Sequence, residues 1–118
     1  NVYRTEMTGA QIKVILEDVC DNLFNIDPFY QQGGDMVRVG GMNYTCAPKA
    51  SMGNRISDLT MTKTGEKLDA DRKYVVGGWA SVNENVEGPA IYDLMEGFIS
   101  RKKSIDLPVQ QAVKVIGL

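Results

Sequence analysis

The chain has 118 residues, of which 43% are hydrophobic and 24% are charged, with a formal net charge of −2 and no histidine. This length suits one domain that buries roughly two thirds of its unfolded surface, and the small net charge indicates neither a nucleic acid nor a membrane as partner. Because histidine is absent and the carboxylates have no ligand-like spacing, we expect no metal site and no catalytic residue within this chain.

The first part of the chain predicts a strand and then a helix. Residues 2–7 are typical of a short strand. Thr8 and Gln11 have the spacing of a capping box, in which each side chain bonds the other residue's backbone N–H. Apolar residues then recur at helical spacing and define one face: Ile12, Ile15, Leu16, Val19, Cys20 and Leu23. On the opposite side Lys13 and Glu17 lie four residues apart, where we expect a weak ion pair.

Strand-like segments follow the turn at Asp27-Pro28. Residues 36–44 predict a strand that is interrupted by a bulge or bend at Gly40-Gly41. Residues 55–62 alternate imperfectly and predict another strand. Residues 74–83 predict a further strand, buried at its start, which continues past a pair of glycines.

The C-terminal part predicts a second helix and a last apolar segment. Pro89 fits the first helical turn, and the basic residues 101–103 suit the negative end of the helix dipole. The apolar stripe of this helix consists of Ile91, Leu94, Met95, Phe98 and Ile99. Residues 107–118 contain an apolar run that predicts a final strand or a docked segment. The order of elements indicates one α+β domain over residues 1–118, a mixed β-sheet with helical cover.

The two cysteines, Cys20 and Cys46, do not have the spacing of a CxxC motif. Cys20 lies on the apolar face of the first helix, which favours a buried free thiol over a metal ligand or nucleophile. Cys46 falls on an expected loop. A disulfide between the two is compatible with the sequence, which leaves the question open.

Three polar or aromatic residues are candidates for a binding site, each with a structural alternative. Arg38 stands between two valines in what we expect to be a buried strand, and its guanidinium can clamp an oxyanion. A structural ion pair or simple exposure explains it as well, and we favour structure. Trp79 follows a glycine pair and forms either a pocket wall or part of the core. Asn83 follows an expected strand end, where binding loops often start, although a polar turn also explains it.

Several motifs in their order along the chain resemble one enzyme family. Met7-Thr8-Gly9, the motif at residues 53–56 and Tyr74-Val75-Val76 resemble the C-terminal domain of 5′-nucleotidases, dinuclear metallophosphoesterases. Within that family, residues 15–19, 21–25, 31–41 and 78–82 are similar to the SoxB family, the bacterial sulfur-oxidation thiosulfohydrolases. The resemblance covers nearly the whole chain and weakens after about residue 100.

The chain departs from nucleotidases where these bind the nucleoside. In those enzymes the Tyr-x-Val strand leads into an Asn-x-Phe segment and a Gly-Gly-Asp-Gly turn, whose aromatic residue stacks on the base. Here residues 77–83 follow the strand, and no Gly-Gly-Asp-Gly turn occurs. We therefore do not expect a nucleoside pocket of the usual kind.

The resemblance implies that the chain is the C-terminal domain of a longer, periplasmic two-domain enzyme. Two manganese ions are expected in the missing N-terminal metallophosphoesterase domain, and the substrate is expected to be a cysteine-S-sulfonate on the SoxYZ carrier protein, from which sulfate is released. This chain alone would be inactive and would recognise substrate and partner. We expect Trp79, Ser81 and Asn83 to face the interdomain cleft and bind substrate, with Arg38 as a weaker candidate.

Two alternatives remain from the sequence. The chain can instead be the substrate-binding C-terminal domain of a 5′-nucleotidase or nucleotide-sugar hydrolase with a reshaped pocket. It can also be a pure docking module, whose surface binds the carrier protein and contacts no small molecule.

Overall fold

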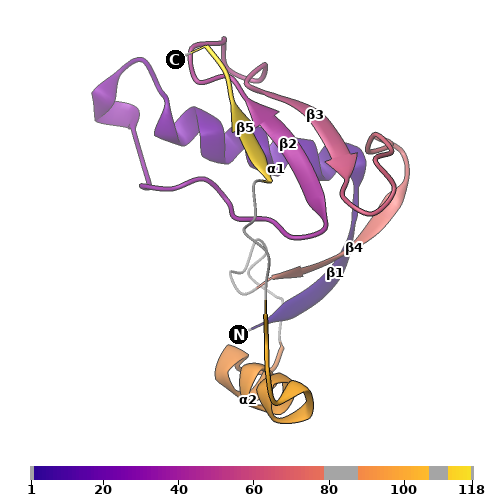
Figure 1. Cartoon of the computed structure of the whole chain (residues 1–118). Coiled ribbons are helices and arrows are strands. Elements are labelled where there is room, and N and C mark those ends of the chain that lie inside the picture. Colours follow the sequence, from indigo (N-terminus) through magenta and orange to yellow (C-terminus); the bar gives the residue numbers. More distant parts are fainter. Residues whose placement is uncertain (1, 79–87, 107–111, 118) are drawn as a thin grey trace. The chain divides into compact units, whose positions relative to one another are not determined.

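The computed structural model of the chain describes residues 2–78, 88–106 and 112–117. Figure 1 shows its helices and strands, which confirm the α+β class. In chain order they are β1 (Tyr3–Thr8), α1 (Gly9–Leu23), the 3-10 helix η1 (Pro28–Tyr30), β2 (Met42–Cys46), β3 (Ile56–Met61), β4 (Lys73–Gly78), α2 (Ile91–Lys102) and β5 (Val113–Val115). No helix in these ranges is long and apolar enough to cross a membrane.

The chain forms two compact units. Unit 1 consists of Asn1–Met7 and Lys73–Val109, and unit 2 consists of Thr8–Arg72 and Gln110–Leu118. Unit 1 contains the strand pair β1–β4 and helix α2, whereas unit 2 contains α1 and a separate sheet.

The sheet of unit 2 has the strand order β3-β2-β5, with β2 antiparallel to β3 and parallel to β5. Helix α1 covers one face of this sheet (Figure 1), as the helical cover predicted from the sequence requires. Its buried core joins the helix to both longer strands through Leu16, Cys20, Tyr44, Cys46 and Ile56. The C-terminal tail therefore supplies an edge strand, one of the two roles that its apolar run predicted.

The start of α1 has the capping box that the sequence predicts. The Thr8 hydroxyl accepts the Gln11 N–H at 3.2 Å, and the Gln11 amide oxygen accepts the Thr8 N–H at 2.9 Å. The next residue, Gly9, donates its N–H to the carbonyl oxygen of Arg72 at 3.1 Å. A Cβ on Gly9 would collide with the backbone carbonyl of Asp69, so only glycine fits this close approach.

Strand β2 differs from its prediction at both ends. It begins at Met42 rather than at residue 36, and it extends to Cys46, which was expected on a loop. Gly41 has a φ of +85°, a left-handed conformation that breaks an extended strand. Beyond it, Tyr44 pairs with Val113 of β5, a partner far away in the sequence that local patterns do not reveal.

Strand β3 confirms the strand predicted near residues 55–62 and adds a bulge. Asn43 pairs with Thr60 and Thr45 pairs with Ser57, so two residues of β3 lie opposite one residue of β2. Asp58, within this bulge, has a φ of 53°, where a short polar side chain is tolerated better than a branched one.

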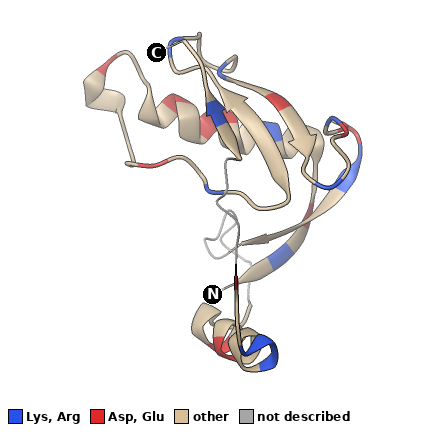
Figure 2. Ribbon diagram, viewed as in Figure 1, with Lys and Arg blue, Asp and Glu red and all other residues tan. Residues whose placement is uncertain are grey.

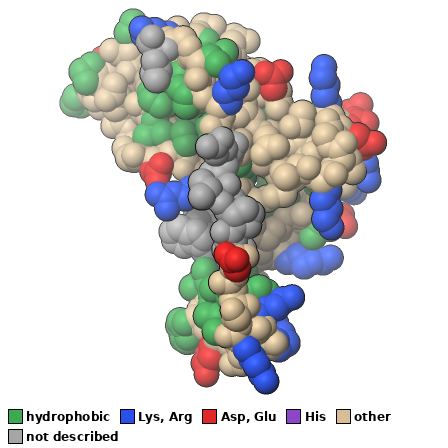
Figure 3. Space-filling model, viewed as in Figure 1, with side chains coloured by type: hydrophobic (Ala, Val, Ile, Leu, Met, Phe, Trp, Pro, Cys, Tyr) green, Lys and Arg blue, Asp and Glu red, His purple; other side chains and the backbone are tan. Residues whose placement is uncertain are grey.

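In unit 1, β4 is less buried than predicted, and the second helix starts later. The residues of β4 alternate between exposed and half-buried, and Val75 is 57% exposed. Helix α2 has Ala90 as its N-cap, so Pro89 precedes the first turn instead of lying in it. Its basic end, Arg101 and Lys102, is visible in Figure 2. The predicted apolar stripe of α2 forms a set of green side chains in Figure 3, each between 39% and 47% exposed.

Candidate functional site

The segment before β2, residues 31–41, crosses unit 2 without forming a strand and carries the candidate residue Arg38. Its middle is held against the core. The Tyr44 hydroxyl donates a hydrogen bond to the Val37 carbonyl oxygen at 3.1 Å. Met36 and Val39 pack against the buried cluster from the same segment.

Both ends of the 31–41 segment are also attached by backbone hydrogen bonds. Gln32 donates its N–H to the carbonyl oxygen of Asn22 at 2.8 Å, close to the end of α1. At the other end, Thr62 donates its N–H to the carbonyl oxygen of Gly41 at 3.0 Å. The 31–41 segment is thus a loop anchored at its middle and at both ends. Its exposed side chains therefore project from a defined backbone position.

Arg38 leaves this loop toward solvent, with a side chain that is 90% exposed. Its Nη2 donates to Oδ2 of Asp35 at 2.9 Å, and the Asp35 side chain is itself 67% exposed. The expectation that Arg38 stands in a buried strand is therefore wrong, and the ion pair is the structural alternative raised from the sequence. Because exposed pairs contribute only about 0–1 kcal/mol, the guanidinium can exchange Asp35 for another oxyanion at little cost.

The other predicted site residues, Trp79, Ser81 and Asn83, lie outside the described residues. The structure describes the strand that leads to them, β4, up to Gly78. A Cβ on Gly78 would come within 2.7 Å of the Tyr3 hydroxyl oxygen, so a side chain there would require the Tyr3 ring to move. The role of the three residues remains a prediction.

A buried polar cluster in unit 2 was not foreseen from the sequence. Glu17 is buried, and its carboxylate accepts two backbone N–H groups, that of Arg55 at 3.1 Å and that of Ile56 at 2.9 Å. The predicted surface pair with Lys13 is wrong, because this carboxylate faces the start of β3. Glu17 thereby positions the first residues of that strand against α1.

The Arg55 side chain completes this cluster with three separate partners. Its Nε donates to the Pro48 carbonyl oxygen at 3.0 Å, its Nη2 to the Phe24 carbonyl oxygen at 2.9 Å, and its Nη1 to Oδ1 of Asp21. Phe24 is the C-cap of α1, so the guanidinium also satisfies a carbonyl group at the negative end of the helix. With all three of its nitrogens engaged and 6% of its side chain exposed, Arg55 is a structural residue, unlike Arg38.

The sequence contains a signal from which this cluster could have been predicted. Glu17 directly follows Leu16 and lies three residues before Cys20, so it borders the buried face of the helix. Asp21 lies four residues later on the same side. Carboxylates at the margin of an apolar face require a buried cation or N–H donors, and Arg55 at the start of a strand is such a cation.

The described residues contain no group of three or more histidine, cysteine, aspartate or glutamate side chains that could hold a metal ion. The carboxylates of the buried Glu17 and the partly buried Asp21 are bonded to N–H donors instead. The manganese ions implied by the family resemblance therefore do not fit the described part of this chain.

A turn between α1 and the 31–41 segment exposes large apolar side chains. Ile26 is 98% exposed, Phe29 86% and Tyr30 60%. The turn is ordered by Asp27, whose Oδ1 accepts the Phe29 N–H at 3.0 Å, and the two aromatic rings meet edge to face at 5.5 Å between centroids. We call residues 26–30 the apolar turn; such an ordered apolar surface is typical of contact sites.

Comparison with known proteins places these features in a family. The family model "5′-nucleotidase, C-terminal domain" matches residues 1–104. The solved structure of the sulfate thiohydrolase SoxB from Thermus thermophilus, in complex with glycerol, is 33% identical in sequence, with a TM-score of 0.83 over 99% of this chain and 22% of that one. No curated protein matches the chain.

A second solved structure shares the fold at lower identity. It is a putative 5′-nucleotidase from Staphylococcus aureus in complex with alpha-ketoglutarate, 16% identical, with a TM-score of 0.66 over 97% of this chain and 27% of that one. The chain thus spans about a quarter of the length of either relative, and the fold expected from the resemblance is confirmed.

Proposed function

Because the chain belongs to the 5′-nucleotidase C-terminal domain family, we propose that it is the substrate- and partner-recognition domain of a SoxB-like thiosulfohydrolase. The observation that carries this proposal is the 33% identity to the sulfate thiohydrolase over 99% of the chain, against 16% to the nucleotidase. The absence of a Gly-Gly-Asp-Gly turn supports the same choice, since it removes the usual nucleoside site.

The proposed reaction belongs to the full-length parent, of which this chain is one domain. The parent would hydrolyse the S–S bond of a cysteine-S-sulfonate on the SoxYZ carrier in the periplasm: the hydroxyl of water goes to the sulfonate sulfur, and a proton goes to the thiol. Sulfate and a free thiol result. The two manganese ions belong, in this proposal, to the N-terminal domain, because no described side chains fit them.

Arg38 is the described residue best suited to hold the sulfonate. Its side chain is 90% exposed on an anchored loop, and the Asp35 carboxylate that it contacts is an oxyanion with the same single negative charge as a sulfonate. A planar guanidinium recognises such groups through paired N–H donors. The sulfonate would therefore replace Asp35 on Arg38 without rearrangement of the loop.

The experiment for Arg38 is steady-state kinetics of sulfate release by the full-length parent. Arg38→Ala should raise KM about tenfold, the loss of one charge-assisted hydrogen bond, and leave kcat nearly unchanged. The matched control is Lys49→Ala, which removes an exposed positive charge from another loop of unit 2. An equal rise in KM for the two variants would mean that Arg38 attracts the substrate only through its charge and does not contact it.

The roles proposed for Trp79, Ser81 and Asn83 rest on the sequence alone. Ser81→Ala and Asn83→Ala should each raise KM for the sulfonate substrate without changing the unfolding midpoint. Trp79→Phe keeps an aromatic ring and serves as the folding control for Trp79→Ala. Unchanged kinetics in all of these variants would show that the three residues do not bind the substrate.

A second candidate function, docking of the carrier protein, is favoured by the apolar turn. Ile26 and Phe29 are the most exposed large apolar residues that the structure describes, and Asp27 holds the turn that presents them. The double variant Ile26→Ser with Phe29→Ser should lower kcat/KM for the carrier-bound substrate. The same variant should leave kcat/KM for free cysteine-S-sulfonate unchanged. An equal loss on both substrates would point to the sulfonate site instead.

A further inference from the structure

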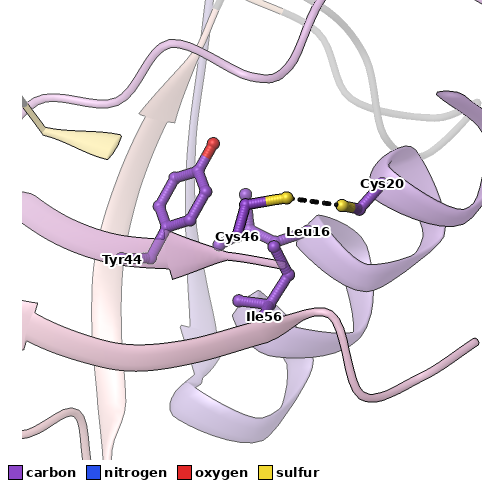
Figure 4. Close-up of a cluster of buried hydrophobic side chains, with 5 residues drawn as sticks. All are labelled: Leu16, Cys20, Tyr44, Cys46 and Ile56. Carbon is purple, nitrogen blue, oxygen red and sulfur yellow. Dashed lines mark hydrogen bonds between the residues drawn. The ribbon is translucent and has the colours of Figure 1, made fainter. Parts of the chain in front are cut away.

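The two cysteines meet in the core of unit 2 (Figure 4). The Sγ atoms of Cys20 and Cys46 lie 2.9 Å apart, between helix α1 and the central strand β2. Both residues are buried, with 0% and 1% of their surface exposed. The other three members of this buried cluster are Leu16, Tyr44 and Ile56. Arg55 and Glu17 also lie near enough to interact electrostatically with Cys20.

We propose that Cys20 and Cys46 form an intramolecular disulfide that ties helix α1 to strand β2. Shortening the 2.9 Å separation to the about 2.0 Å of an S–S bond requires a movement smaller than an atomic radius. No third cysteine, histidine or carboxylate among the described residues completes a metal site with them. This inference does not depend on the proposed function.

The bond would close the loop that carries both candidate contact surfaces. The two cysteines are 26 residues apart, and the apolar turn and the 31–41 segment lie between them. A cross-link of this length removes conformational freedom from the unfolded chain. It would fix both ends of the loop from which Arg38 and the apolar turn project.

The two thiols can be oxidised by exchange with a low-molecular-weight disulfide such as oxidised glutathione, which is the oxidant. A thiolate of one cysteine attacks the reagent and releases one glutathione thiol; the thiolate of the second cysteine then attacks the mixed disulfide and releases the other. Two protein thiols lose two protons and two electrons, and the reagent gains them. Burial, followed by the hydrogen bond to Cys46, raises the pKa of the folded Cys20 thiol to about 12. The exchange should therefore occur before the core closes.

The test is peptide mapping of the full-length parent, purified without reductant, denatured and alkylated before digestion with trypsin. Cleavage after Lys13, Arg38 and Lys49 separates the cysteines into the peptides 14–38 and 39–49. We expect these two peptides as one linked species, which dithiothreitol splits with a gain of two hydrogen atoms. Alkylation of both peptides without reductant, even after refolding with oxidised glutathione, would overturn the proposal.

A second measurement separates a structural disulfide from a chance oxidation product. Without denaturant, dithiothreitol should reduce the pair much more slowly than it does in unfolded protein, because both sulfurs are buried. The double variant Cys20→Ala with Cys46→Ala should show a thermal unfolding midpoint that no longer responds to reductant, whereas that of the oxidised wild type falls. A wild-type midpoint unaffected by reduction would contradict a stabilising cross-link.

Discussion

The hydroxyl of Tyr44 donates a 3.1 Å hydrogen bond to the carbonyl oxygen of Val37, and so joins the central strand β2 to the loop that carries Arg38. Tyr44 is 2% exposed, and its ring belongs to the core of unit 2. A single buried side chain therefore supports the fold and positions the candidate anion-binding loop. Loss of this hydroxyl should disturb both.

Tyr44 predicts a loss of stability at alkaline pH. Burial, with smaller contributions from Cys46, Cys20 and Asp35, raises its pKa from 10.0 to about 12. Between these values the unfolded tyrosine releases its proton while the folded one keeps it, so the native state binds more protons and the free energy of unfolding falls as pH rises. The full loss is about 2–3 kcal/mol, measurable by urea unfolding across this pH window.

Tyr44→Phe is the control for this pH dependence. At neutral pH it should cost about 1 kcal/mol, because the hydrogen bond to Val37 is lost. Above pH 10 its stability should fall less steeply than that of the wild type, since the phenol is gone. Parallel curves for the two proteins would show that Tyr44 is not the group responsible. The Cys20 thiol, with its raised pKa, contributes to the alkaline loss only in reduced protein.

Arg55 should be the most sensitive charged residue that the structure describes. Arg55→Ala removes the cation that pairs with the partly buried Asp21 carboxylate, and leaves the carbonyl groups of Pro48 and Phe24 without their donor, so it should cost about 3 kcal/mol. Arg55→Lys keeps the charge but cannot reach the carbonyl groups of both Pro48 and Phe24, so an intermediate loss is expected. Thermal unfolding measures both.

The matched comparison for Arg55 is Arg38→Ala. The Arg38 side chain is 90% exposed and pairs with a carboxylate that is 67% exposed, so its removal should change the free energy of unfolding by less than about 0.5 kcal/mol. Similar losses at the two arginines would contradict the distinction drawn between a structural and a surface guanidinium.

Gly9 tests the close approach at the start of α1. Gly9→Ala places a methyl group against the backbone of Asp69 and should cost about 1–3 kcal/mol, despite the better helix propensity of alanine. Gly34→Ala is the control, because a Cβ there meets nothing within 4 Å. An unchanged unfolding midpoint for Gly9→Ala would mean that the loop of Asp69 moves away freely.

The bulge in β3 gives a further prediction. Asp58 has a φ of 53°, so Asp58→Gly should be neutral or slightly stabilising, and Asp58→Val should lose about 1–3 kcal/mol through backbone strain. Urea unfolding of the two variants measures the difference. If valine is tolerated as well as glycine, the bulge does not restrict this residue.

Local patterns predicted the elements whose signals are local. Thr8 and Gln11 fix the start of α1 through bonds between neighbours in the sequence, and the strand near residues 55–62 lies where its alternation indicates. By contrast, β2 extends to Cys46 because Tyr44 to Cys46 pair with β5, a contact between distant segments that no local pattern contains. The start of that strand was missed for a related reason: Met36 and Val39 are apolar because they pack against the core, although their segment forms no strand.

The candidate site was predicted only in part, because charge alone does not reveal burial. Arg38, between two valines, suggested a buried strand and is exposed, whereas Arg55, in a polar context, is buried. Whether each arginine is buried depends on its partners. Arg55 bonds Glu17 and Asp21 of α1, which are distant in the sequence, whereas Arg38 bonds Asp35 of its own loop. Trp79, Ser81 and Asn83 remain predictions of the sequence.

The central claim concerns the substrate class, and one assay tests it most directly. The full-length parent, supplied with manganese, would be given a cysteine-S-sulfonate carrier peptide and, separately, AMP, and the release of sulfate and of phosphate would be measured. Our account predicts sulfate from the peptide and no phosphate above background from AMP. Phosphate from AMP without sulfate from the peptide would contradict it and assign the domain to a nucleotidase with a reshaped pocket.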